Sequence, residues 1–192
     1  MDVGPELVRA AQAGDRDAME DLVSRSYRQA YTLALRLTGN PDDAAEATQE
    51  AYIRVVRGLK RLDEPGAFPT WVFRIVSNVC MTQMRRKSRR ETPMDLESNQ
   101  DPAPVDVEAL AIGGVVREDL ERLVSGLPDA YRTVVVLRDV YGMTGEETAD
   151  VLGITAGAVK VRLHRARRRL RDDLLDAYPD WGTGGDDERA SA

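Results

Sequence analysis

Three basic and amide side chains in the first half of the chain have the spacing and the chemistry to hold a nucleic-acid strand. Arg74, Asn78 and Arg85 lie four and seven residues apart, so a helix would align them, with Met81 between them, in one solvent-facing row. Guanidinium groups bind phosphates, and a side-chain amide both donates and accepts hydrogen bonds at a base edge. We therefore predict that this row, continued by Arg86, contacts nucleic acid.

A second candidate surface lies on a basic segment near the end of the chain. A buried stripe is predicted there for residues at helical spacing, which are Val159, Leu163, Ala166, Leu170 and Leu174. The residues predicted to point away from that stripe, with their flanking cations, are Gly157, Lys160, Val161, His164, Arg165 and Arg168. In DNA-binding helices the N-terminal half reaches base edges, and arginines further along hold phosphates. The alternative is an ordinary solvated basic helix.

The residues before this basic helix favour the DNA-binding interpretation. Thr144 and Glu147 have the spacing of a capping box, which would open a short helix through Leu152. Gly153 then ends that helix, and Thr155 is placed to cap the basic one. A short helix, a three-residue turn and a longer basic helix together predict a helix-turn-helix.

Acidic and amide residues mark a third surface, on a helix predicted from Pro41 to about Gly58. Asn40 is a natural N-cap for it, and proline suits the first turn. The acids that follow recur at threes and fours and are Asp43, Glu46 and Glu50. Taken alone, this pattern is typical of a solvated face with acids near the positive end of the helix dipole.

Two aromatic residues stand beside the row that contains Arg74. Stacking of a base on an aromatic side chain contributes about 1–3 kcal/mol, so Trp71 and Phe73 are candidates for that contact. Trp71 lies nearer the apolar residues and is interpreted as packing in the core. Phe73, at the edge of the apolar stripe, suits either purpose equally well.

The elements that must position these residues are all predicted to be helices. One apolar stripe contains Met19, Leu22, Val23, Tyr27, Ala30, Leu33, Ala34 and Leu37, and Gly39 ends its helix. Another helix, from Phe68 to about Arg90, is predicted to bury Phe68, Val72, Ile75, Val76 and Val79. The β-branched run Val134–Val136 lies between helical patterns and is interpreted as buried helix. Because no strand-like alternation persists, the predicted fold class is all-α.

Composition divides the chain into two small helical domains joined by a flexible acidic linker. Prolines and acids accumulate after the first basic run, without a single Lys or Arg among them. We expect an N-terminal domain over residues 1–90, the linker over 91–114, a C-terminal helix-turn-helix domain over 115–176 and a disordered tail over 177–192.

The overall composition argues against an enzyme, a metal site and a membrane protein. The 192 residues include 27 basic and 33 acidic side chains, so cations matter through local clusters and not through net charge. Cys80 and His164 are the sole cysteine and histidine, which is too few for a zinc cluster or a catalytic pair. We therefore expect no catalytic residue, no metal and no cofactor. Because the sequence shows no secretion signal and no apolar stretch long enough to span a membrane, we expect a protein of the reducing cytoplasm that is not inserted in a membrane.

The two halves of the chain resemble the two domains of one known family. Leu127–Pro128, Leu152–Ile154 and Gly157–Arg167 are similar to the promoter-binding domain of the extracytoplasmic-function (ECF) sigma factors of bacterial RNA polymerase. Asp43–Glu50 looks like the polymerase-binding helix of that family, and Phe68–Asn78 looks like its promoter-melting helix. Two motif sets in the right order are more specific than a helix-turn-helix alone.

The chain also departs from the family at three positions that bear on base preference. Thr82 stands where the family often has aspartate, Ala158 where it often has serine or threonine, and Val161 where it often has serine.

The resemblance implies a sigma factor that directs core polymerase to promoters and helps to melt them. The polymerase clamp coiled coil would contact the acidic helix through Asp43, Glu46, Gln49 and Glu50, and the polymerase flap would be a second contact. The minus-ten element would contact Phe73, Arg74, Asn78, Arg85 and Arg86. The minus-thirty-five element would contact Thr155, Gly157, Lys160, Val161, His164, Arg165 and Arg168. Members of the family are commonly restrained by an anti-sigma factor, which is a further candidate partner.

Two other interpretations of the pattern predict different behaviour. A helix-turn-helix regulator would bind operator DNA without core polymerase, whereas a sigma factor would bind its promoter well only with core. A module that only docks on polymerase would give no promoter-specific transcription. The helix from Phe68 to about Arg90, with its polar row and basic end, already argues against the regulator.

Overall fold

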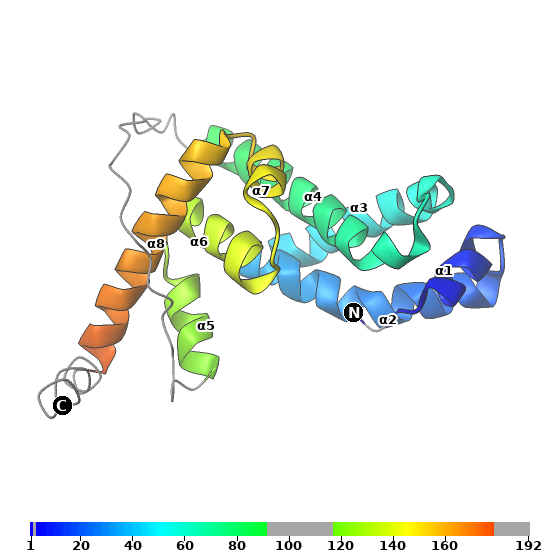
Figure 1. Ribbon diagram of the computed structural model, residues 1–192, viewed down its shortest axis with the longest axis horizontal. Coiled ribbons are helices and arrows are strands. Elements are labelled where there is room, and N and C mark those ends of the chain that lie inside the picture. The colour runs from blue at the N-terminus through cyan, green and yellow to red at the C-terminus, as the bar shows by residue number, and fades with distance from the viewer. Residues whose placement is uncertain (2, 92–116, 179–192) are drawn as a thin grey trace, which may run out of the picture. The chain divides into compact units, whose positions relative to one another are not determined.

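The computed structural model describes residue 1 and residues 3–91 and 117–178. Every regular element among them is a helix, which confirms the predicted all-α fold (Figure 1). Contacts between Cα atoms divide the helices into two compact units, the first built on α1 to α4 and the second on α5, α6 and α8 with the start of α7. Apart from Glu91, Ala177 and Tyr178, the predicted linker and tail lie outside the described residues.

The first unit is a helical bundle whose turns are set by local sequence. Its elements are α1 (Pro5–Gln12), α2 (Arg16–Thr38), α3 (Pro41–Gly58), the 3-10 turns η1 (Leu59–Arg61) and η2 (Pro65–Ala67), and α4 (Phe68–Glu91). Gly39 ends α2 in the left-handed conformation, with φ of 69°, and its N–H donates to Leu35 O at 2.8 Å. The Asn40 side chain then caps α3 by accepting from the N–H groups of Asp42 and Asp43 at 2.9 and 3.0 Å. The predicted boundary between these helices is confirmed.

The core of the first unit lies among α2, α3 and α4. Of the predicted α2 stripe, the fully buried members are Leu22, Ala30, Leu33, Ala34 and Leu37. This core also contains a polar cluster that was not predicted: the Tyr52 hydroxyl donates to Ser26 Oγ at 2.7 Å, and Ser26 Oγ donates to Leu22 O at 2.6 Å. The short helix α1 packs on α2 and was likewise not expected.

Helix α4 carries a wider buried stripe than predicted, and the prediction for Met81 is wrong. Met81 is 6% exposed, although it was expected on the solvent-facing row. The reason is that α4 packs on both α2 and α3. Because the two partner helices pack on different sides of α4, they bury a wider part of its surface than one helix would. Ser77, Cys80 and Met81 are therefore buried together with the apolar residues.

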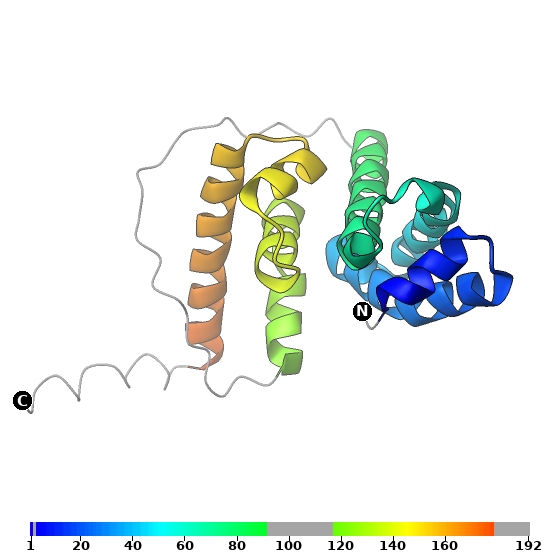
Figure 2. The same ribbon diagram turned by 45° about the vertical axis from the view of Figure 1, so that its right-hand side comes forward.

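The second unit contains α5 (Arg117–Ser125), α6 (Asp129–Val135), the π-helical turn η3 (Val136–Val140), the start of α7 (Gly145–Leu152) up to Ala149, and α8 (Ala156–Ala177). Helix α8 runs alongside α5 and α6 (Figure 2). Val134, Val135 and Val136 are all buried in helix, as predicted, although the π-helical turn that begins at Val136 was not expected. On α8 the buried residues are Val159, Leu163, Ala166 and Leu174, and Leu170 is partly exposed.

Candidate nucleic-acid interface

The cationic row on α4 forms as predicted once Met81 is removed from it. Arg74, Asn78 and Arg85 are exposed and share one face of a continuous helix, and Arg86 is exposed beside them. Thr82, on the same stretch, donates its hydroxyl to Asn78 O at 2.8 Å, so it lies against the helix backbone. The row offers guanidinium groups and an amide in line, which is the inventory for contacts with a phosphate backbone and a base edge.

The two aromatic residues near this row have different surroundings. The Trp71 ring lies 6.3 Å from the Phe68 ring, centroid to centroid, and packs so close to Gly58 that a Cβ there would meet it at 3.2 Å. Its interpretation as a packing residue is therefore supported, and a side chain at residue 58 would require the indole to shift by a few tenths of an ångström. Phe73 is partly exposed but lies about 100° around the helix from Arg74, so it does not belong to the row.

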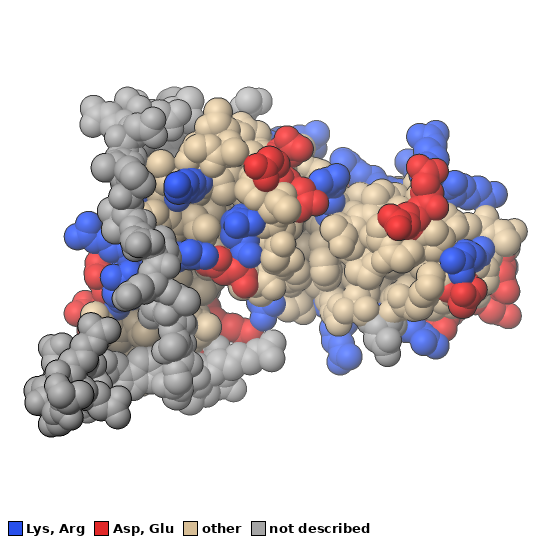
Figure 3. All heavy atoms as spheres, in the orientation of Figure 1, with Lys and Arg blue, Asp and Glu red and all other residues tan. Residues whose placement is uncertain are grey.

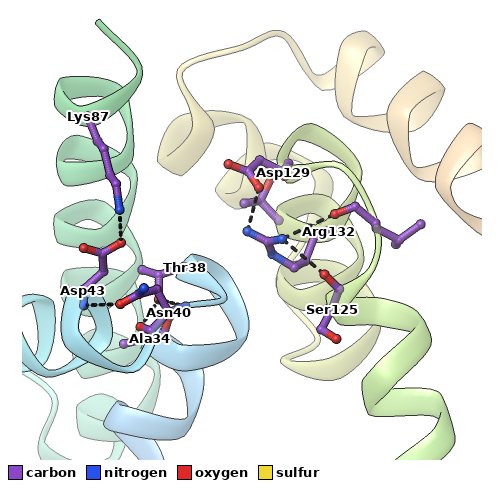
Figure 4. Close-up of polar contacts among 10 residues, drawn as sticks. Ala34, Thr38, Asn40, Asp43, Lys87, Ser125, Asp129 and Arg132 are labelled. Carbon is purple, nitrogen blue, oxygen red and sulfur yellow. Dashed lines mark hydrogen bonds and ion pairs between the residues drawn. The ribbon is translucent and has the colours of Figure 1, made fainter. Parts of the chain in front are cut away.

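The four polar residues of α3 that the family resemblance assigns to polymerase binding divide into two pairs. One pair makes contacts within the chain, and the other faces solvent. Asp43 pairs with Lys87 at 2.8 Å (Figure 4), and Glu50 pairs with Arg54 and accepts from Gln83 at 3.3 Å. Glu46 and Gln49 are exposed. A groove of about 400 Å³ at this end of the unit is lined by Thr38, Asp43, Glu46, Gln83, Met84, Arg86 and Lys87.

The same face of α3 carries two exposed apolar side chains that sequence reasoning missed. Ile53 is 52% exposed and Val56 is 45% exposed. Both lie outside the buried stripe of α3, Ile53 about two turns after Glu46 and Val56 about two turns after Gln49. The sequence does contain a signal for their exposure. Both residues fall outside the helical periodicity that the buried alanines and valine of α3 define.

The helix-turn-helix has the local geometry that the sequence predicts. Thr144 and Glu147 form a reciprocal capping box, with N–H to side-chain oxygen distances of 2.9 and 3.1 Å. Gly153 ends α7 with φ of 68°. Thr155 Oγ1 then accepts from the Ala158 N–H at 3.1 Å and caps α8. A turn of three residues, 153–155, thus joins two capped helices.

The outward face of α8 presents the residues that were predicted for it. Gly157, Lys160, Arg165 and Arg168 are exposed, and Val161 and His164 are partly exposed. Thr155 is exposed as a residue, although its hydroxyl oxygen already caps the helix. On the face shown in Figure 3, cations are mixed with acids and do not gather in one large patch. Contact of this face with phosphates would depend on local groups of cations.

One arginine of the basic run is held by the protein itself. Arg167 forms two hydrogen bonds with the Asp139 carboxylate, at 3.0 and 2.6 Å, and these raise the pKa of its guanidinium above the ordinary value. The contact ties α8 to the turn η3. Nothing in the local sequence pairs these residues, which are 28 positions apart.

A buried cation, Arg132, holds α5 and α6 together. Arg132 of α6 is 7% exposed and donates to Ser125 O at 3.4 Å and Leu127 O at 3.3 Å, at the end of α5. It also pairs with Asp129 at 2.7 Å (Figure 4). It thereby satisfies the last carbonyl of α5, at Ser125, and a carbonyl of the turn that follows, at Leu127.

The described residues contain little else with the chemistry of a site. Cys80 is buried, and burial raises the pKa of its thiol to about 12, so it is a poor nucleophile. No group of three His, Cys, Asp or Glu residues in the described part of the chain is arranged to hold a metal ion. Among the helices in residues 3–91 and 117–178, none is both long and apolar enough to cross a bilayer.

Comparison with known proteins matches both units to one family. The family profile described as Sigma-70 region 2 matches residues 22–90, and the one described as Sigma-70, region 4 matches residues 117–170. The ECF RNA polymerase sigma factor SigW of Bacillus subtilis is 31% identical over 179 residues, which span 88% of this chain and 95% of SigW. SigE of Mycolicibacterium smegmatis is 37% identical over 169 residues, which span 84% of this chain and 64% of that protein.

Solved structures agree on the fold. CnrH, in its complex with the cytosolic domain of CnrY, is 27% identical, with a TM-score of 0.53 over 91% of this chain and 97% of CnrH. The sigma factor RpoE of Bartonella quintana, in complex with the anti-sigma factor NepR, is 21% identical, with a TM-score of 0.56 over 81% of this chain and 96% of RpoE.

Proposed function

Because this chain belongs to the ECF sigma factors of RNA polymerase, we propose that it directs core polymerase to specific promoters through two DNA-reading surfaces and one polymerase-binding surface. The observation that carries the proposal is the coexistence of a capped helix-turn-helix with an exposed row of Arg74, Asn78 and Arg85 on a separate helix. A regulator that binds operators without core polymerase is not favoured, because the first unit matches Sigma-70 region 2.

The row on α4 is assigned to the minus-ten element. A protein that hydrolyses no nucleotide can open a duplex only by binding the opened form better than the closed one. Flipping a base out of the stack costs a few kcal/mol, which contacts to the displaced strand must offset. Arg74, Arg85 and Arg86 would hold phosphates of the non-template strand and Asn78 would bond to a base edge, while Phe73 would stack from the side of the helix.

The outward face of α8 is assigned to the minus-thirty-five element. Its N-terminal half would lie in the major groove, and Arg165 and Arg168 would hold phosphates further along. The remaining residues in this assignment are Thr155, Gly157, Lys160, Val161 and His164. Thr155 would act mainly as the cap that fixes the start of the helix.

The exposed face of α3 is assigned to the clamp coiled coil of polymerase. Interfaces typically combine an apolar centre with a polar rim, and α3 offers Ile53 and Val56 next to Glu46 and Gln49. Asp43 and Glu50 would form the edge of this surface, where they already pair with Lys87 and Arg54. The flap of polymerase and an anti-sigma factor are proposed as further partners of the two units.

The test is run-off transcription of a genomic library by core polymerase with and without the chain. We expect initiation at a defined set of promoters that share two sequence elements, and only when the chain is present. Gln49→Ala and Glu50→Ala should reduce the pull-down of core, whereas Glu6→Ala on α1 should not. Equal transcription with and without the chain on every template would contradict the proposal.

A further inference from the structure

The first turns of α8 are poor in side chains that can form hydrogen bonds. Its first six residues are Ala156, Gly157, Ala158, Val159, Lys160 and Val161. Lys160 is the sole polar side chain among them, and the hydroxyl oxygen of the preceding Thr155 is occupied by the Ala158 N–H. Bidentate recognition of a base pair uses Arg, Lys, Asn, Gln or a carboxylate, so Lys160 is the one side chain of this stretch that can supply it. The other five residues can contribute to sequence reading by apolar contact and close approach alone.

Val161 is placed to make an apolar contact in the groove. It is partly exposed and lies on the side of α8 opposite Val159, Leu163 and Ala166, which are buried. It stands one helical turn after Gly157, so the two residues share the outward face. The one apolar group that DNA offers in the major groove is the C5 methyl group of thymine.

Gly157 is a glycine that the protein itself does not require. Its φ is not in the left-handed region, and a Cβ built there would meet only Thr155 Oγ1, at an ordinary 3.8 Å. Glycine in a helix is less stable than alanine, so its presence at an open position costs stability for no internal gain. The absence of a side chain at such a position allows another molecule to come close to the helix backbone.

We propose that Gly157 and Val161 together read a thymine of the minus-thirty-five element, with Val161 touching the C5 methyl group and Gly157 leaving the space for the base pair to come close. This inference rests on the assignment of α8 to that element. It gives the chain a base preference that serine, the residue the family often has at position 161, would not provide through apolar contact.

Replacement of thymine by deoxyuridine tests the contact directly, because it removes the methyl group and nothing else. Each thymine of the minus-thirty-five element, on either strand of a promoter obtained by run-off transcription, is replaced in turn. With the native chain and core polymerase we expect one replacement to weaken promoter binding about fourfold, the value of one buried methyl group. With Val161→Ala that ratio should fall to about one, whereas Val140→Ala, which trims an exposed valine of η3, should keep it.

Gly157→Ala tests the role of the glycine, because we expect it to maintain or raise stability and to weaken promoter binding. The thermal midpoint should stay equal or rise, because the added methyl group meets no clash. Promoter binding should fall, and Gly66→Ala, another glycine with open space and ordinary φ, should leave it unchanged.

Four outcomes would overturn the inference or part of it. Promoter-specific initiation with no sensitivity to any thymine replacement, or a minus-thirty-five element without thymine on either strand, would refute it while leaving the proposed function standing. Unimpaired promoter binding by Gly157→Ala would refute the role of the glycine. No promoter-specific initiation by the native chain would refute the proposed function, and this inference with it.

Discussion

At the scale of single residues, Arg132 is the side chain whose loss should cost the second unit most. Its guanidinium serves two carbonyls and one carboxylate while being 7% exposed. Arg132→Ala leaves those carbonyls without a donor in a dry environment, so we expect the free energy of unfolding to fall by about 2–3 kcal/mol. Urea denaturation followed by circular dichroism measures it. Arg165→Ala, an exposed arginine on α8, should change it by less than about 0.5 kcal/mol.

Tyr52 makes the stability of the first unit depend on alkaline pH. Burial raises the pKa of its hydroxyl from 10.0 to about 12, because ionisation inside the core lacks solvation. The unfolded chain releases this proton at lower pH than the folded chain does, so the stabilising effect is complete below pH 10 and is lost as pH rises toward 12. Cys80, with its pKa raised from 9.0 to about 12, acts in the same direction.

Tyr52→Phe should therefore reduce the alkaline loss of stability. At neutral pH the variant should be less stable by about 1 kcal/mol, because the hydrogen bond to Ser26 is gone. The difference between native chain and variant should shrink as pH rises from 10 to 12. Urea titrations at pH 8 and pH 11 measure the change, and Tyr31→Phe, a partly exposed tyrosine, serves as the control. A difference that is the same at both pH values would contradict the prediction.

At the scale of helices, the parts that could be predicted are those that local sequence decides. Gly39 with Asn40, and Gly153 with Thr155, mark helix ends through backbone conformation and capping, which involve neighbours in sequence. Met81 could not be placed, because its burial depends on how many helices α4 packs against. Side-chain pairs between distant elements, such as Arg167 with Asp139, leave no periodic signal in sequence.

The Arg167–Asp139 pair also limits how many cations α8 can offer to DNA. Asp139→Asn removes the charge that holds the guanidinium, so Arg167 should become available to a phosphate. We expect tighter non-specific DNA binding and a plot of log K against log salt that is steeper by about 0.9, the value of one added phosphate contact. Both partners are about one-third exposed, so the stability lost should be no more than about 1 kcal/mol. Asp173→Asn, near Arg169 at 3.9 Å, is the matched control.

At the scale of the whole molecule, the separation of charge matters more than its sum. The net charge is -6, which by itself opposes approach to DNA. The chain offsets this by placing cations in rows on α4 and α8 and acids on α3. Because the row on α4 and the acidic face of α3 belong to different helices of one unit, DNA opening and polymerase binding should be separable by mutation.

The double variant Arg74→Ala, Asn78→Ala tests that separation. Both side chains are exposed, so the fold and the α3 surface should remain intact, and pull-down of core polymerase should equal that of the native chain. Strand opening should slow by about 10- to 100-fold, because two contacts that favour the opened strand are lost. Permanganate reactivity of thymines at the minus-ten element measures opening, and Arg9→Ala on α1 controls for the loss of an exposed cation. Normal opening by the double variant would show that the row on α4 does not hold the displaced strand, and loss of core binding would show that the two surfaces are not independent.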